Sequence, residues 1–116
     1  MKNRPFHERI GFAVAGLKAG WLRERSFRTH CLSAFAALVA LILLRPPAVW
    51  WAVVAMIAAA VMALELLNSA IEGIIDLLHP GLHPEIKIIK DMVAGAVLIA
   101  SIAALMVAAA LLVALL

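Results

Sequence analysis

The sequence predicts an all-α integral membrane protein, in which an N-terminal amphipathic helix lies in the membrane interface and three transmembrane helices follow. Hydrophobic residues make up 66% of the 116 residues and charged residues 15%, whereas apolar residues make up about 45–50% of a typical soluble domain. The mean hydropathy of +1.09 reflects the same bias. The apolar residues are concentrated in three long stretches separated by segments that contain proline. We therefore expect residues 1–116 to form a single membrane domain.

An amphipathic pattern covers residues 1–28. Apolar and basic side chains recur there at helical spacing on opposite faces, the apolar set being Ile10, Ala13, Leu17, Gly20, Trp21 and Phe27 and the basic set Arg9, Lys18, Arg23 and Arg25. A basic amphipathic helix with a tryptophan at headgroup level is typical of the membrane interface. Glu24 is the one acid in the run from 23 to 28. The pattern leaves open whether it pairs with a neighbouring arginine at the surface or turns toward a functional site.

The sequence contains three apolar stretches that predict transmembrane helices, at about 29–45, 48–78 and 91–116. The first stretch is short for a hydrocarbon core about 30 Å thick, so we expect its helix to begin nearer Ser26, with Arg28 and His30 at headgroup level. Residues 79–90 contain two prolines and a glycine. Such residues interrupt a helix, and they predict a loop between the second and third spans.

Positive charge is distributed unevenly along the chain. Seven of the ten lysines and arginines precede residue 30, two lie within 79–90, and only Arg45 lies between the first two spans. By the positive-inside rule, the N-terminus and the 79–90 segment face the cytoplasm. The net charge of +3 then matches anionic lipid headgroups, so we expect no nucleic-acid partner. The single cysteine, Cys31, cannot form a disulfide within the chain.

Within the second predicted span, residues 65–76 place several polar side chains on one helical face. At about 100° per residue, these side chains fall within a wedge of about 100°; they are Glu65, Asn68, Ser69, Glu72 and Asp76. Ionisable groups inside a membrane span are costly and usually face a bundle interior, a water-filled cavity or a cation. This stretch is therefore the candidate functional site.

The residue types restrict the chemistry of this site. The sequence has neither a Walker A phosphate loop nor a glycine-rich dinucleotide-binding sequence, and Ser69 has no histidine near it in the sequence to act as its base. Carboxylates that bind Mg²⁺ beside a lysine that neutralises phosphate would suit phosphoryl transfer. A chain of intramembrane acids would equally suit a small ion or proton carrier. The residues alone leave both readings open.

Three segments of the chain resemble a known family. The sequences ELLNSAIEGIID at 65–76, KDMVAGAVLIA at 90–100 and GLKAGWLRERSFRTH at 16–30 are similar to motifs of the prokaryotic membrane-embedded diacylglycerol kinases, a family that includes undecaprenol kinases. The resemblance extends over about residues 6–105. It implies a homotrimeric helical bundle with active sites shared between protomers.

The resemblance also implies roles for individual residues. Glu65 matches the general base for the lipid hydroxyl, with Asn68 beside it as a second catalytic residue. Glu24 and Glu72 match the pair of carboxylates that bind Mg²⁺ and thereby contact ATP. The N-terminal arginine that contacts the nucleotide in the family has no assigned counterpart in this chain.

Further residues are matched to the nucleotide site. Lys90 corresponds to the lysine that contacts phosphate, Asp91 to its neighbour, and His83 to a histidine near the nucleotide. Asp76 and Ser69 correspond to supporting positions of the same motif.

Taken as expectations, these matches describe a multi-pass lipid kinase of the bacterial inner membrane, with its N-terminus and active site on the cytoplasmic side. It would transfer the γ-phosphate of MgATP to the primary hydroxyl of diacylglycerol and give phosphatidic acid. The alternative acceptor is undecaprenol, which would give undecaprenyl phosphate. The expected partners are thus ATP with Mg²⁺, a membrane lipid and two further copies of the chain, and the non-enzyme alternative remains an ion or proton carrier.

Overall fold

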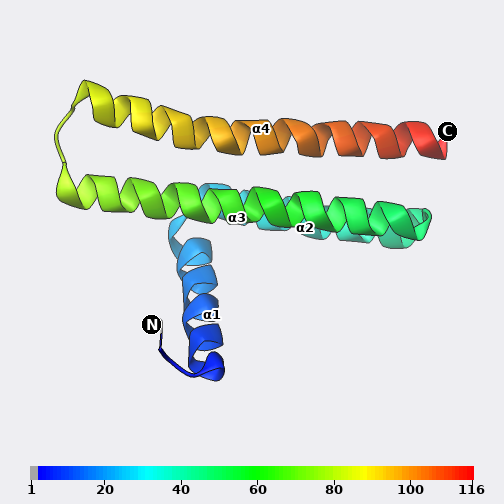
Figure 1. Cartoon of the computed structure of the whole chain (residues 1–116). Helices are drawn as coiled ribbons and strands as arrows, with labels where there is room; N and C mark the ends of the chain where they lie inside the picture. The colour runs from blue at the N-terminus through cyan, green and yellow to red at the C-terminus, as the bar shows by residue number, and fades with distance from the viewer. Residues whose placement is uncertain (1–2) are drawn as a thin grey trace.

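A computed structural model describes residues 3–116 as four helices joined by short connections (Figure 1). These helices are α1 (Phe6–Arg23), α2 (Arg25–Leu44), α3 (Ala48–Leu78) and α4 (Pro84–Leu115). The last three are each long and apolar enough to cross a membrane, which confirms the predicted all-helical architecture with three spans. Residues 1 and 2 of the predicted N-terminal helix lie outside the described residues.

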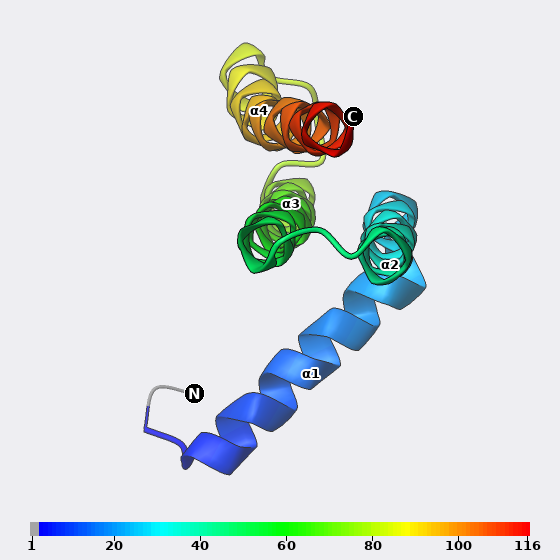
Figure 2. The same ribbon diagram turned by 90° about the vertical axis from the view of Figure 1, so that its right-hand side faces the viewer.

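The helix α3 lies in the middle of the fold. Both α2 and α4 pack along it, and the end-on view in Figure 2 shows α3 between the other two. The helix α1 extends away from this layer and runs transverse to the three long helices (Figures 1 and 2). Consequently α3, which carries the polar wedge, is the element that contacts each of the other three helices.

The first helix ends earlier than predicted. Glu24 adopts an extended backbone conformation, with φ of −113° and ψ of 109°, and separates α1 from α2. Residues 25–28, which the amphipathic pattern includes in the interfacial helix, therefore form the first turn of α2, in agreement with the expected start of the first span near Ser26. Arg28 Nη1 donates a hydrogen bond of 2.7 Å to the carbonyl oxygen of Trp21 across this corner. The sequence does not reveal the boundary between α1 and α2, because the helix is interrupted at the single residue Glu24 and contains neither proline nor glycine there.

The loop between the second and third spans is shorter than predicted. Helix α3 ends at Leu78 as expected, but α4 begins at Pro84, so only residues 79–83 are non-helical and the predicted loop to residue 90 is wrong. Proline is well tolerated in the first turn of a helix, where its missing N–H costs no hydrogen bond. His83 Nδ1 accepts a hydrogen bond of 3.1 Å from the backbone N–H of Glu85 and caps the helix.

The chain buries few side chains by itself. Within the described residues, the buried hydrophobic side chains are Phe27, Leu41, Val61, Ala100 and Leu111. Large apolar side chains are exposed along all four helices, for example Phe35, Met56 and Leu105. Apolar surface of this extent is a site for lipid or for another protein chain. The fold is thus an open layer of helices that needs an apolar environment.

Candidate active site

The polar wedge of α3 has a buried end at Glu65 and an exposed end at Asp76. Glu65 is the one charged residue that is buried among residues 3–116, with 6% of its surface exposed. Asn68, Ser69 and Glu72 are half-buried, and the side chain of Asp76 is 63% exposed. Polar groups thus continue along one face from the interior toward the α3–α4 loop.

Helix α2 provides a partner for the buried acid. His30 Nε2 lies 3.1 Å from Glu65 Oε1, and the two side chains are 28% and 8% exposed respectively. His30 was placed at headgroup level in the sequence analysis and was not among the candidate site residues. A signal for it existed, because His30 is a polar side chain at the start of one span and Glu65 is an acid within the next. Ionisable groups within spans usually pair with one another.

One polar atom beside Glu65 lacks a partner. The side-chain oxygen of Asn68 is buried and accepts no hydrogen bond within the described part of the chain. Buried polar atoms are nearly always paired, so an unpaired one calls for an explanation such as a bound donor or ion. Asn68 is one turn from Glu65 on the same face. The two residues together present free oxygen atoms at the buried end of the wedge.

Helix α4 brings a cation to the exposed end of the wedge. Lys90 Nζ lies 2.6 Å from Asp76 Oδ1, and Glu72 lies one turn before Asp76 on α3. The early start of α4 places Lys90 on a helix rather than in a loop. The structure therefore joins Lys90 of α4 with Asp76 of α3.

The other candidate residues occupy different surroundings. Asp91 pairs with Lys87 at 2.6 Å on the exposed side of α4, and His83 serves as the helix cap described above. Glu24 is half-buried at the corner between α1 and α2. One turn before it, Gly20 lies so close to α3 that an added Cβ would meet Leu66 Cδ2 at 2.5 Å. The corner is therefore held against α3 at Leu66.

The carboxylates do not form a complete metal site by themselves. Between residues 3 and 116, no group of three or more His, Cys, Asp or Glu side chains is arranged to hold a metal ion. Mg²⁺ bound with a nucleotide, however, usually takes only one or two protein carboxylates, and phosphate oxygens and water complete its coordination. Glu72 and the unpaired Asn68 oxygen lie one turn apart on α3, and Glu24 lies at the separate α1–α2 corner. All three offer oxygen donors of the kind that Mg²⁺ prefers, so their chemistry fits a cation that arrives with its nucleotide.

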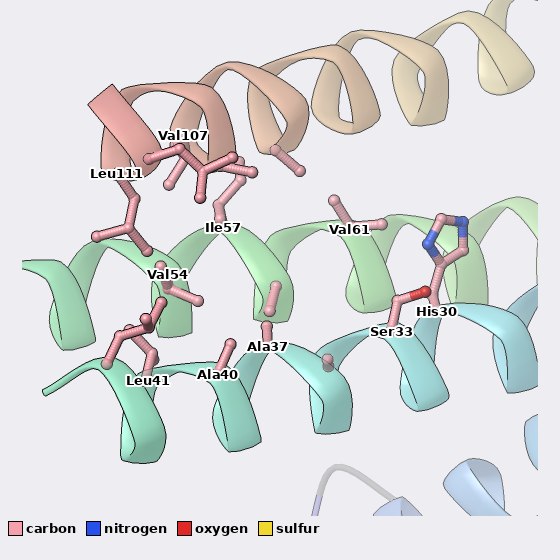
Figure 3. Close-up of a pocket in the computed structure, with 16 residues that line it drawn as sticks. His30, Ser33, Ala37, Ala40, Leu41, Val54, Ile57, Val61, Val107 and Leu111 are labelled. Carbon is pink, nitrogen blue, oxygen red and sulfur yellow. The ribbon is translucent and has the colours of Figure 1, made fainter. Parts of the chain in front are cut away.

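An apolar groove extends from His30, the partner of Glu65, along the spans. It has a volume of about 300 Å³ and is lined by residues of α2, α3 and α4. Figure 3 shows His30 and Ser33 at one end and Leu41 and Leu111 at the other. Apart from His30 and Ser33, the lining side chains are aliphatic. The groove thus has a polar end beside Glu65 and hydrocarbon walls beyond it.

The chain has three helices that can cross a membrane, one buried carboxylate and an apolar groove. These features define a multi-pass α-helical membrane protein with a polar site. A model of the prokaryotic diacylglycerol kinase family matches residues 11–112. This match covers most of the chain, and the chain belongs to that family.

The relatives of the chain are named for two different activities, diacylglycerol kinase and undecaprenol kinase. A diacylglycerol kinase of Synechocystis sp. is 42% identical over 102 residues, which are 87% of this chain and 58% of the relative. An undecaprenol kinase of Bacillus subtilis is 38% identical over 74 residues, 64% of this chain and 60% of the relative. A diacylglycerol kinase of Escherichia coli K12 is 35% identical over 94 residues, 81% of this chain and 77% of the relative. The chain thus spans less than two thirds of the length of the first two relatives.

Proposed function

We propose that this protein is a lipid kinase that transfers the γ-phosphate of ATP to the primary hydroxyl of diacylglycerol and forms phosphatidic acid. One observation carries the proposal: His30, which lines the polar end of an apolar groove, lies 3.1 Å from the buried carboxylate of Glu65. A carboxylate in this position can receive a proton from a hydroxyl whose hydrocarbon chains occupy the groove. The family to which the chain belongs supports the same reaction.

In the proposed step, Glu65 accepts the hydroxyl proton while the hydroxyl oxygen attacks the γ-phosphorus. The new oxygen–phosphorus bond forms as the bond between the γ-phosphorus and the bridging oxygen breaks, and ADP leaves. Asn68, whose side-chain oxygen has no partner, lies one turn from Glu65 on the same face and borders the site of the acceptor hydroxyl. Ser69 supports this end of the wedge. Catalysis then depends on positioning and on charge stabilisation, as in other phosphoryl transfers.

ATP binds at the exposed end of the wedge in this proposal. Lys90 releases Asp76 and neutralises phosphate oxygens. Glu24 and Glu72 would hold Mg²⁺, which when bound offsets the negative charge of the phosphates. Asp91 and His83 line the nucleotide site at the start of α4. The contact of Lys90 with Asp76 supports this placement, because it brings a cation to the acidic face of α3.

Undecaprenol is the second candidate acceptor. The undecaprenol kinase of Bacillus subtilis is 38% identical to this chain, and a polyprenol also carries a primary hydroxyl on a long hydrocarbon chain. The walls of the groove are compatible with either hydrocarbon. An ion or proton carrier is less well supported, because beyond Ser33 the groove has no polar side chain to continue a path across the span.

We place the protein in the bacterial inner membrane as a homotrimer. Helix α1, with its basic and apolar faces, lies in the cytoplasmic interface, and the α3–α4 loop faces the cytoplasm as well. The active site is then open to cytoplasmic ATP. The thin core of the single chain supports association, and the shared sites proposed for the trimer combine residues of neighbouring protomers.

A direct assay with both alcohols tests the proposal. Purified protein in mixed micelles is given radiolabelled ATP and either diacylglycerol or undecaprenol, and labelled lipid is measured. We expect transfer to diacylglycerol that stops when EDTA is added and returns with Mg²⁺. Faster transfer to undecaprenol would change the acceptor, and transfer to neither alcohol would contradict the lipid-kinase proposal.

A further inference from the structure

We infer that His30 is a positioning residue for Glu65: it binds one oxygen of the carboxylate and leaves the other free to accept the proton of the lipid hydroxyl. This inference rests on the proposed function and deepens it. It assigns a specific task to a residue of α2 that the acidic motif of α3 does not contain.

The proposed role of Glu65 gives the direction of the hydrogen bond that we infer. His30 Nε2 lies 3.1 Å from Glu65 Oε1, which is within hydrogen-bonding range. As the base of the proposed step Glu65 is ionised, and an ionised carboxylate can only accept, so the inferred bond places a proton on Nε2. Glu65 Oε1 is therefore engaged, and Oε2 is the oxygen that remains available as a base.

His30 is also the one polar partner of this carboxylate. Among the hydrogen bonds and ion pairs of residues 3–116, the Glu65 carboxylate has no other contact. Lys90, the cation of the wedge, is bound to Asp76 instead. Without His30, the Glu65 side chain would be buried with no group to hold its orientation.

The location of His30 suits this task. Its ring is three-quarters buried and lies at the polar end of the groove (Figure 3). It therefore fixes Glu65 beside the place where the acceptor hydroxyl enters. Misplacement of a catalytic group by about 1 Å can reduce the rate about 100-fold. Loss of the hydrogen bond between His30 of α2 and Glu65 of α3 is thus expected to reduce turnover more than nucleotide binding.

Two substitutions of His30 separate its hydrogen bond from its bulk. In His30→Gln, the side-chain amide offers an N–H at a similar reach, so we expect kcat within about threefold of the wild type. In His30→Leu, the donor is lost, and we expect kcat to fall by about 10- to 100-fold with little change in the KM for ATP. Thr29→Val is the matched control, since Thr29 is exposed and its hydroxyl bonds to the Arg25 carbonyl of its own helix.

A second comparison tests whether His30 acts through Glu65. On the Glu65→Gln background, His30→Leu is expected to leave the residual rate unchanged, because the group that it positions is already absent. Circular dichroism and thermal unfolding monitor folding, and His30→Ala replaces His30→Leu if the latter does not fold.

The possible results are distinct. Equal losses of kcat in the Gln and Leu variants, or no loss in either, would overturn the inference. A further loss on the Glu65→Gln background would also overturn it, since His30 would then act independently. If the wild type phosphorylates neither lipid alcohol, the proposed function fails before these variants are compared.

Discussion

At the scale of single residues, Glu65 determines what the site can do. It is the charged group with the least access to solvent in the described chain, yet it has one defined partner. Unpaired charges in apolar surroundings are strongly unfavourable, so a sequence that keeps an acid here needs it for more than packing. In the proposed reaction the free Oε2 accepts the hydroxyl proton, and Asn68, with its unpaired oxygen, lies one turn away on the same face.

The first prediction concerns this carboxylate. Glu65→Gln keeps the size of the side chain and removes its ability to accept a proton, so we expect kcat to fall by about 10²- to 10⁴-fold. Binding of MgATP should remain within about threefold, because Glu65 lies away from Lys90 and Asp76. Lipid phosphorylation and equilibrium nucleotide binding measure the two effects. A variant that keeps more than half of wild-type turnover would show that another group is the base.

Residues on one helix were predictable, and contacts between helices were not. The 3.6-residue period alone places Glu65, Asn68 and Glu72 on one face, since this depends only on helical geometry. The contact of His30 with Glu65 depends on how α2 packs against α3, which the period of either helix does not specify. Lys90 could be matched to the site by family resemblance, but its bond to Asp76 required the structure.

At the scale of elements, the corner between α1 and α2 positions the N-terminal helix. Glu24 interrupts the helix, and Gly20 allows α1 to approach α3 at Leu66. The Phe27 side chain, which is buried, also lies against Gly20. This corner links α1 to the stretch of α3 that contains Glu65.

The second prediction tests this close approach. In Gly20→Ala the new methyl group would lie 2.5 Å from Leu66 Cδ2 and 3.2 Å from Phe27 Cδ2, so both side chains must shift. We expect a lower unfolding temperature and lower activity, despite the higher helix propensity of alanine. Gly16→Ala is the matched control, because nothing lies within 4 Å of its added Cβ. Equal unfolding temperatures for the two variants would argue against a packed corner in solution.

The limits of the helices show which local signals can be read from sequence. The start of α3 at Ala48 and its end at Leu78 follow from proline on either side. Pro84 was misread as an interruption, although it is the first residue of α4 and follows a capping histidine. Proline interrupts a helix in its interior but is favoured in the first turn. A proline that directly follows a capping residue therefore indicates the start of a helix.

At the scale of the whole molecule, the three long helices form a layer with little interior. α3 separates α2 from α4 (Figure 2), and the side chains that are buried within one chain are few and mostly small or aliphatic. Much of the apolar surface must therefore be covered by lipid or by other copies. The count of three spans followed from hydropathy, whereas the number of chains in an assembly has no comparable signal in one sequence.

The third prediction tests the shared sites proposed for the trimer. Glu24→Gln and Glu65→Gln proteins are unfolded, mixed and refolded together in micelles. If each site takes these two residues from different protomers, random mixing should restore up to about one quarter of wild-type activity. Each variant refolded alone is the control. Activity of the mixture no higher than the mean of the two controls would indicate that both residues come from one protomer.

The gradual change in exposure along α3 also affects how the proposed reaction would draw on its two substrates. Eleven residues separate the buried Glu65 from the exposed Asp76, which corresponds to roughly 16 Å along the helix. In the proposed reaction, one substrate arrives by diffusion in two dimensions and the other in three. The rate should depend on the mole fraction of acceptor lipid in the bilayer and not on its amount per volume of solution. Dilution of the acceptor with inert lipid would slow the proposed reaction even when the total acceptor in the sample is unchanged.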